Sequence, residues 1–489
     1  MTPEGVAPEA GVPARGLRRL LIEPRRPESI RNSHRAPWLV VATVCVGAFM
    51  GQLDASIVTL AFPTLRHSFH ASLASVQWVG QAYLLMLIGL LSAIGSYADM
   101  IGRKLLYTYG FLIFIAGSAL CGLAPNLPVL VAFRLIQGAG AAMLAANSVA
   151  IIVGTIPRGQ LGRALGIQGA AQALGLALGP ALGGLLIDLG GWRLIFLVNV
   201  PFGLVGTVLA WLLIPRSRDL AERRTFDWAG LAVFLPAVSA LLLAVSYGDR
   251  YGWSSLLIVG LFIGAAALLG LFVTRERRAT PPMLDLGLFS RASFSAGIVG
   301  GLLSYLVLFG TLTVVPFFLE VARHKSTAVA GSTLLALPLG LGLTAPFAGW
   351  LADRLGARLL TVGGMSVAAA ALACSLLAKE DFVLYLVTLA AAGIGLGAFM
   401  SPNNAAVMSA IPRHQAGMAS GTLNMTRSLG TSLGLAFGAL FYTLGAGVHS
   451  ASPNQAARGY TDAMLFLAGV AAVAAVIAGL RQGSGNRHR

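Results

Sequence analysis

The chain has 489 residues, of which 56% are hydrophobic and 11% charged, well below the charged fraction of about 25% in soluble domains. Its net charge of +16 is no sign of a nucleic-acid partner, because the basic residues stand in short segments between long apolar runs. Runs of about 20 apolar residues cross a bilayer as helices, and their continuous pattern excludes a β-barrel. The composition therefore predicts an all-α integral membrane protein.

Residues 1–37 are rich in Pro and Arg and lack the apolar core of a signal peptide, so we expect a disordered cytoplasmic tail. Fourteen apolar segments follow, and a short cytoplasmic tail at 481–489 ends the chain. The segments lie near 38–61, 76–98, 105–123, 127–153, 164–188, 193–214, 228–247, 254–274, 293–320, 328–352, 359–378, 382–410, 416–445 and 461–480.

The distribution of basic residues predicts the orientation. An even number of spans places both termini on one side of the membrane. With both termini in the cytoplasm, 25 Lys and Arg residues fall in inside segments and seven in outside segments, and Arg134 and Arg427 lie within spans. Because short cytoplasmic loops carry an excess of Lys and Arg, this split predicts a multi-pass protein of the plasma membrane with cytoplasmic termini.

The sequence contains an internal repeat. Residues 95–104 read GSYADMIGRK and residues 349–358 read GWLADRLGAR, each directly after an apolar segment. The two copies divide the spans as six, two and six: an N-terminal half at 38–214, a linker with two inserted helices at 215–292, and a C-terminal half at 293–480. Two six-helix halves of the same orientation indicate a transporter with its site between the halves.

Other classes of membrane protein lack their characteristic residues here. The sequence contains no loop that resembles a channel filter. All seven histidines lie in tails, loops or span ends, the three cysteines lie inside apolar runs, and no P-loop occurs. We therefore expect no enzyme, no catalytic residues, no metal and no cofactor.

The first repeat copy resembles the loop motif Gly-x-Leu-x-Asp-x-x-Gly-Arg-Lys of the major facilitator superfamily, with Tyr97 in place of the Leu. The second copy matches more loosely. Glycines allow a tight turn, and an aspartate can pair with arginines or a helix N-terminus and so latch the two halves together. The alternative is a plain polar turn that carries topology charges. The residues expected to gate the cytoplasmic side are Gly95, Asp99, Gly102, Arg103, Asp353 and Arg358.

The fourth span carries a second motif of the superfamily, which resembles Arg-x-x-Gln-Gly-x-Gly and begins at Arg134. Arg134 lies about two turns into the span, where an ionised side chain is energetically costly, and Gln137 shares its helix face. The resemblance implies a role in proton relay or gating. The alternative is an arginine that snorkels to the cytoplasmic interface.

The fifth span resembles the antiporter motif Gly-x-x-x-Gly-Pro-x-x-Gly-Gly, which marks exporters of the superfamily. Glycines four residues apart let another helix approach closely, and the proline permits a kink. Ordinary small-residue packing is the alternative. The matching residues are Gly175, Gly179, Pro180, Gly183 and Gly184.

The first span holds Asp54 within a stretch that resembles the pattern Leu-Asp-x-Thr-x-x-Asn-x-Ala-Leu-Pro of the fourteen-span drug/proton antiporters. Ser56, Thr59 and Phe62 depart from that pattern, so detailed substrate contacts are not implied. Asp54 lies about 24 Å into its span at 1.5 Å per residue. A carboxylate at this depth indicates proton coupling or substrate binding, and a structural hydrogen bond or a pair with an arginine is the alternative.

Stretches of the twelfth and thirteenth spans also match this branch, and three residues of the C-terminal half are candidates for the cavity or its outer mouth. Asn403 and Asn404 lie in the twelfth span, and Glu320 ends the ninth. A surface ion pair with a neighbouring basic residue is the alternative for Glu320. The tenth span has no acidic residue at 330–348, which argues against dicationic substrates.

Taken over nearly the whole chain after residue 37, the resemblance implies a monomeric multidrug efflux transporter with a major-facilitator-type fold. Such a protein exchanges protons for small amphipathic or lipophilic compounds, such as drugs and antibiotics, by alternating access. A dedicated exporter of one self-made metabolite or antibiotic would carry the same motifs. The antiporter motif argues against a proton-driven importer, and no site for a non-transport function is visible.

Overall fold

The computed structural model describes residues 26–28, 33, 35–71, 73–217, 227–279, 282, 284–325, 327–412, 415–446 and 452–480. Most of the predicted N-terminal tail, all of the C-terminal tail and residues 218–226 of the linker lie outside this set. The described residues are almost entirely helical and contain no β-strand, as the continuous apolar runs predict.

Helices lie over all fourteen predicted segments. The N-terminal half contains α2 (Ala36–Leu60), α4 (Leu73–Ile101), α5 (Arg103–Gly122), α6 (Leu127–Thr155), α7 (Leu161–Gly190), and α8 (Leu194–Leu197) with α9 (Asn199–Leu213). The insert contains α10 (Trp228–Tyr251) and α11 (Leu256–Glu276). The C-terminal half contains α12 (Ala292–Phe317), α13 (Thr327–Leu334) with α14 (Ala336–Leu355), α15 (Ala357–Ser375), α16 (Phe382–Ser409), α17 (Ala416–Ala446) and α18 (Pro453–Gly479).

The length and apolar composition of the helices indicate which of them can span a membrane. Among the described residues, 12 helices are long and apolar enough to span, or 13 if the bent helix α7 counts as one span. Helix α10 falls short because only Trp228–Leu241 forms a sufficiently apolar stretch. The count of fourteen therefore stays a prediction.

The two repeat copies fold alike. Gly102 separates α4 from α5 with a φ of 122°, and Gly356 separates α14 from α15 with a φ of 86°. Both angles lie in the left-handed region, which glycine adopts without steric cost. A single glycine therefore turns the chain between two helices at the same place in each half.

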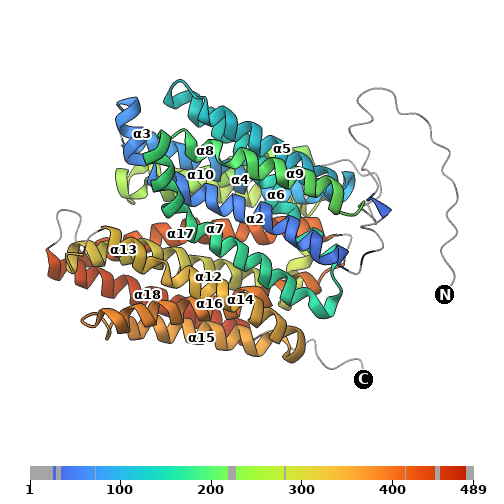
Figure 1. Cartoon of the computed structure of the whole chain (residues 1–489). Coiled ribbons are helices and arrows are strands. Elements are labelled where there is room, and N and C mark those ends of the chain that lie inside the picture. The colour runs from blue at the N-terminus through green and yellow to red at the C-terminus, as the bar shows by residue number, and fades with distance from the viewer. Residues whose placement is uncertain are drawn as a thin grey trace, which may run out of the picture.

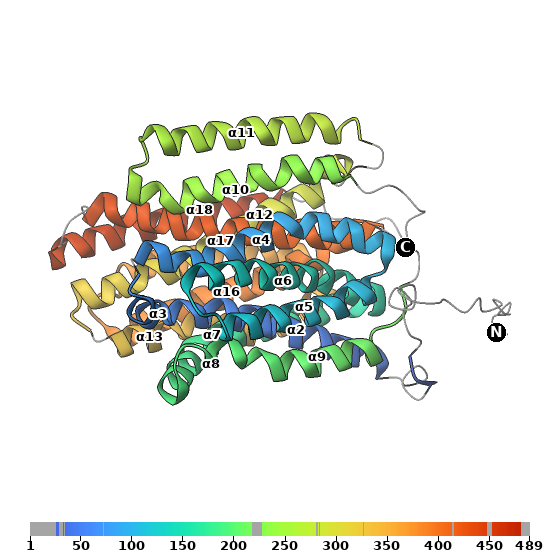
Figure 2. The same cartoon turned by 90° about the horizontal axis from the view of Figure 1, so that it is seen from above.

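The two halves lie side by side, as Figure 1 shows, with the blue-to-green half above the yellow-to-red half. They meet along two seams: α7 packs against α14 and α16, and α17 packs against α4 and α6. Figure 2 shows the α10–α11 hairpin at one edge of the bundle, where α10 contacts α4 and α17. The insert therefore flanks one seam between the halves.

Polar contacts join α10 and α11 at the end of the hairpin opposite its turn. Asp227 caps α10 by accepting from the backbone N–H of Gly230, and its carboxylate pairs with Arg275 of α11 at 2.6 Å. Burial raises the pKa of Asp227, but the hydrogen bonds from Arg275 and Gly230 outweigh burial and hold the pKa below its usual value.

The start of α2 and the end of α18 both lie at the end of the bundle that carries the two repeat loops. The guanidinium of Arg163, at the start of α7, stacks over Trp38 at the start of α2, 5.1 Å from the ring centroid. Arg358, in the second repeat copy, donates to the carbonyl of Gly479 at the end of α18 at 2.6 Å. The first and last helices therefore begin and end at the same face of the molecule.

This arrangement yields a topology prediction. We expect a reporter fused to the C-terminus to be cytoplasmic and a reporter inserted at Ser452, before α18, to be external, because one helix separates the two positions. Paired phosphatase and fluorescent-protein fusions measure both. An external C-terminal reporter would rule out the fourteen-span topology.

Candidate functional site

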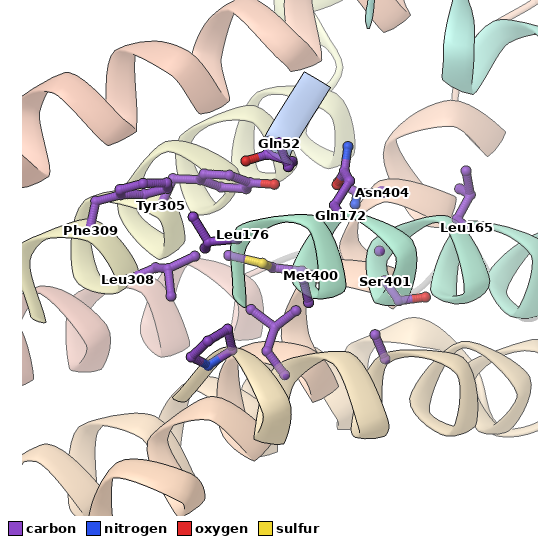
Figure 3. A pocket seen from close by; sticks show the side chains of 15 residues that line it. Gln52, Leu165, Gln172, Leu176, Tyr305, Leu308, Phe309, Met400, Ser401 and Asn404 are labelled. Carbon is purple, nitrogen blue, oxygen red and sulfur yellow. The ribbon is translucent and has the colours of Figure 1, made fainter. Parts of the chain in front are cut away.

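A cavity of about 990 Å³ lies between the two halves and is lined by residues of both. Its lining extends from Leu91 and Ser148 on the side of the repeat loops to Phe62 and Gly331 at the opposite end of the bundle. A smaller recess of about 40 Å³ adjoins it, and Figure 3 shows Gln52, Gln172, Tyr305 and Phe309, which line both spaces. Most of the lining is apolar, with a few amide and hydroxyl groups.

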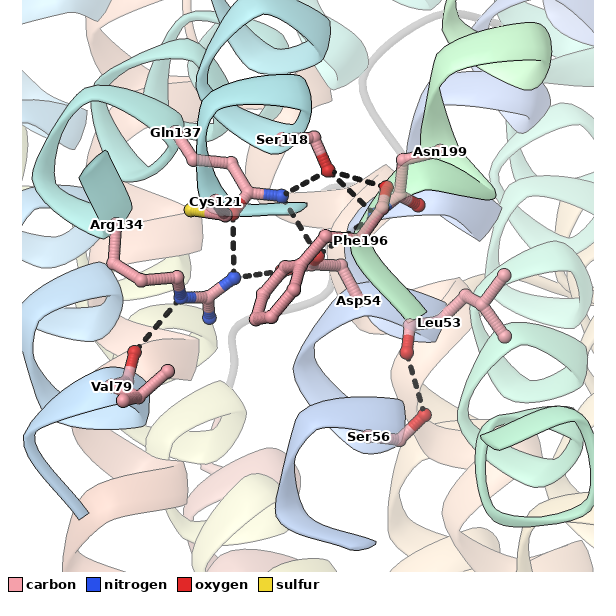
Figure 4. A network of polar contacts seen from close by, with 10 residues as sticks. All are labelled: Leu53, Asp54, Ser56, Val79, Ser118, Cys121, Arg134, Gln137, Phe196 and Asn199. Atoms are coloured by element: carbon pink, nitrogen blue, oxygen red, sulfur yellow. Dashed lines mark hydrogen bonds and ion pairs between the residues drawn. The ribbon is translucent and has the colours of Figure 1, made fainter. Parts of the chain in front are cut away.

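A buried polar network lies beside this cavity in the N-terminal half (Figure 4). Arg134 of α6 donates to Asp54 of α2 at 2.7 Å, and the two side chains are 1% and 0% exposed. Gln137 accepts from Arg134 at 2.7 Å and donates to Asp54 at 2.8 Å. Asn199, the first residue of α9, donates to the same carboxylate at 2.9 Å. Ser118 of α5 accepts from both Gln137 and Asn199 at 3.1 Å.

Arg134 does not snorkel. Its Nε donates to the backbone carbonyl of Val79 in α4 at 2.8 Å, and its guanidinium lies over the rings of Tyr83 and Phe196 at 4.3 and 5.7 Å. The side chain therefore holds a deep position among helices, and it contacts both the cavity and Asp54.

Asp54 itself is fully buried and does not line the cavity. Hydrogen bonds from three side chains stabilise its carboxylate, and a charge-assisted bond of this kind is among the strongest in proteins. A proton added to Asp54 would remove the charge that balances Arg134. Protonation of Asp54 would therefore change the contacts of Arg134, a cationic side chain at the cavity wall.

The sequence alone did not identify Ser118 and Asn199 as members of this network. Asn199 stands in an otherwise apolar stretch at the break between α8 and α9, and Ser118 interrupts the apolar face of α5. A polar residue in a span tends to be functional, so these two positions carried a usable signal.

The first repeat loop joins the two halves at one end of the cavity. The carboxylate of Asp99 accepts from the backbone N–H groups of Gly417 and Met418 at the start of α17, both at 3.0 Å. Arg103 also donates to Asp99, at 2.7 Å. The first N–H groups of a helix have no partner within it, and the helix dipole favours an anion there.

The second repeat loop makes the equivalent contact in the other direction. Asp353 accepts from the backbone N–H groups of Gly162 and Arg163 at the start of α7, at 2.9 and 3.1 Å. Arg358 of the same motif binds the end of α18 instead of Asp353. Each half thus places an aspartate on a helix N-terminus of the other half, and we call this pair of contacts the latch.

Glycines bring the backbones together at the latch. A Cβ atom on Gly95 would overlap the carbonyl of Gly417, and one on Gly349 would overlap the carbonyl of Gly162. The two crossings are equivalent in the two repeats. The close approach explains why each motif begins with glycine.

Removal of the negative charge of a latch aspartate should open the end of the cavity that the latch closes. We expect Asp99→Asn to increase, about tenfold, the labelling rate of Ser148→Cys by an impermeant maleimide applied from the side of the latch, because hydrogen bonds to charged groups contribute about 1.5–3 kcal/mol. The three native cysteines are first replaced by alanine.

Asp381→Asn is the matched control, because Asp381 caps α16 within its own half through Val383 and Leu384. Labelling rates that stay at the starting level in both Asp99→Asn and Asp353→Asn would show that these contacts do not close the cavity.

The antiporter motif faces α2. A Cβ atom on Gly175 would meet the carbonyl of Phe49 at 2.5 Å, and one on Gly179 would overlap the side chain of Ser56. Gly183 is buried and Gly184 half-buried. The stretches Leu161–Gly179 and Leu182–Gly190 make an angle of 44°, so α7 bends at residues 180–181, the position of Pro180.

The remaining candidates occupy different places. Asn404 lines the small recess beside the cavity. Asn403 is buried and donates to the carbonyl of Gly297 in α12 at 2.9 Å. Glu320 lies exposed in the π-helical turn Phe318–Ala322, outside the cavity lining, and its neighbour Arg323 pairs with Glu380 at 2.8 Å. Within the described part of the chain, no group of three or more His, Cys, Asp and Glu residues could hold a metal.

Comparisons with known proteins also identify transporters. The family model described as Major Facilitator Superfamily matches residues 44–274 and 297–484. The riboflavin transporter RibZ of Clostridioides difficile is 33% identical over 87% of this chain and 91% of that protein. The multidrug resistance protein Stp of Mycobacterium tuberculosis is 34% identical over 82% of this chain and 75% of that protein.

A solved structure supports the fold. The human organic anion transporter MFSD10 aligns over 90% of this chain and 99% of that chain, with a TM-score of 0.64 and 16% identity. At this identity the likeness shows the fold alone.

Proposed function

The chain belongs to the Major Facilitator Superfamily, and from that premise we propose that it is a proton-coupled antiporter that exports small amphipathic or lipophilic compounds from the cytoplasm. It would act as a monomer in the plasma membrane, with both termini in the cytoplasm, and would need no cofactor. The multidrug resistance protein Stp among its relatives supports drug efflux.

The observation that carries the proposal is the buried pair of Asp54 and Arg134, at 2.7 Å, beside a cavity between two halves. Among the described residues, Asp54 is the fully buried acidic side chain within a span, whereas Asp99 and Asp353 lie at helix ends and Asp462 of α18 is exposed. Arginine does not deprotonate in proteins, so the titratable member of the pair is Asp54.

The transport cycle follows from this pair. A proton that enters from outside binds Asp54 and weakens its hold on Arg134, Gln137 and Asn199. The freed groups change the contacts of α2, α6 and α9, and the halves rock to open the cavity toward the cytoplasm. Loss of the proton on that side restores the ion pair and resets the carrier.

A dedicated exporter of a single metabolite is the second candidate. The relative named as a riboflavin transporter supports a single substrate, because that name gives one compound. The motifs are the same for both candidates, and a substrate screen separates them. A proton-driven importer is disfavoured by the Gly175–Gly184 antiporter motif in α7.

Reconstitution tests the proposal. The purified protein in liposomes, with an acidic interior and an alkaline exterior, should accumulate some members of a panel of dyes and drugs, and a protonophore should abolish this accumulation. Accumulation that is insensitive to the protonophore would contradict proton coupling.

A further inference from the structure

The charges at the cavity wall are of one sign. Among the described residues that line the cavity, Arg134 and Arg427 are the charged side chains, and no Asp, Glu, Lys or His lines it. The charge of Arg134 is balanced by Asp54. The charge of Arg427 therefore decides the electrostatics of the cavity.

Among the described residues, no carboxylate pairs with Arg427. It lies in α17 of the C-terminal half, is 7% exposed, and donates to the amide oxygen of Asn424 at 3.0 Å. The described ion pairs involve Arg103, Arg134, Arg275 and Arg323 and do not include it. Its guanidinium lies 5.8 Å from the ring centroid of Tyr305 across the packed pair α12–α17.

A buried guanidinium without an anion is energetically unfavourable, because it loses hydration and cannot shed its proton. Arginine also presents a planar fork of N–H donors that matches a carboxylate or another planar anion. An anionic group of a compound in the cavity would supply the missing charge.

An aromatic surface lies next to this cation. The rings of Tyr305 and Phe309, one turn apart on α12, lie 6.3 Å apart with an interplanar angle of 17°, and both line the cavity. Figure 3 shows them beside the amides of Gln52 and Gln172, which can exchange hydrogen bonds with a ligand. Flat aromatic rings pack favourably on such a surface.

We propose that the cavity takes planar aromatic compounds that carry an anionic group, and that Arg427 binds this group. The proposal rests on the exporter function above and specifies its substrate class. Cationic compounds, which the drug/proton exporter resemblance alone would allow, are repelled by an unbalanced Arg427.

A binding measurement tests the substrate class without any transport. Fluorescein and rhodamine 123 share a xanthene ring system and carry opposite charges. By fluorescence anisotropy with the purified protein, we expect fluorescein to bind about tenfold more tightly than rhodamine 123, and Arg427→Gln to remove this difference. Equal binding of the two dyes, or unchanged fluorescein binding by Arg427→Gln, would overturn the proposal.

Two further variants keep this test interpretable. Arg427→Lys keeps the charge and loses the planar fork, so we expect intermediate fluorescein affinity. Arg323→Gln removes an arginine outside the cavity, which pairs with Glu380, and should bind both dyes as the unmodified protein does. Size-exclusion profiles show whether each variant is folded, and Arg427→Lys provides the comparison if Arg427→Gln is not.

Transport in liposomes separates this proposal from the exporter function. Fluorescein accumulation that requires the pH gradient and is lost in Arg427→Gln supports both. Gradient-driven accumulation of rhodamine 123 in preference to fluorescein overturns the substrate class and leaves the exporter function standing. Anion-selective binding without gradient-driven accumulation of any compound supports the substrate class and contradicts the exporter function.

Discussion

Replacing Asp54 with Asn is expected to reduce uphill export driven by a pH gradient to the level of liposomes without protein. The asparagine keeps the size of the side chain and one oxygen that can accept from Gln137 and Asn199. It cannot titrate, and its NH₂ group would face the donating NH1 of Arg134. Counterflow exchange of substrate without a gradient should survive, because it requires alternating access and no proton.

The same substitution leaves the buried Arg134 without an anion, and removal of one partner of a buried ion pair costs about 3–5 kcal/mol. We therefore expect a lower melting temperature for Asp54→Asn. Adding Arg134→Gln should recover part of the lost stability without restoring uphill export, which separates proton coupling from folding.

Glu320→Gln is the matched control, because it neutralises an acidic side chain that lies exposed at the end of a span. It should pump with the pH dependence of the unmodified protein. An Asp54→Asn protein that pumps uphill with unchanged pH dependence would falsify the coupling role and shift attention to Asp99.

Replacing Gly179 with Leu is expected to abolish export while the protein still inserts in the membrane. A Cβ atom alone would overlap the side chain of Ser56 and approach the backbone nitrogen of Ile57 at 3.1 Å. Overpacking of this kind costs about 1–3 kcal/mol or forces the helices apart. Because Ser56 lies two residues after Asp54 in α2, displacement of α2 would also distort the network around Asp54.

Gly363→Leu is the matched control for this substitution. Gly363 lies exposed in α15, and a Cβ atom there would meet nothing within 4 Å. Membrane fractions measure insertion of both proteins, and the liposome assay measures export. Full export by Gly179→Leu would remove the contact of α7 with α2 from the mechanism.

Local features of the sequence determined the helices and their repeat. The long helices follow from long, mostly apolar runs, because a backbone in lipid must satisfy its own hydrogen bonds. The turns at Gly102 and Gly356 were also local, since a positive φ between two helices needs glycine. The depth of Asp54 and the spacing of Arg134 and Gln137 could likewise be counted along the chain.

Only the tertiary structure shows which residues these side chains contact. Asp99 meets Met418 across 319 positions of sequence, and Asp54 meets Asn199 across 145. In a soluble helix, the polar face would indicate which side turns outward. In a membrane, lipid and protein interior are equally apolar, so hydropathy does not encode the rotation of a helix about its axis.

The rotation of each helix about its own axis decides which polar residues reach the cavity. Asn403 and Asn404 are adjacent in sequence, yet Asn404 lines the recess and Asn403 binds a backbone carbonyl. Arg427 appeared in the sequence as one more basic residue within a span. Only the packing of α17 against α12 and against α4 and α6 of the N-terminal half showed that Arg427 faces the cavity with no carboxylate of the described residues beside it. Ion pairs depend on distances between helices, which no local sequence pattern contains.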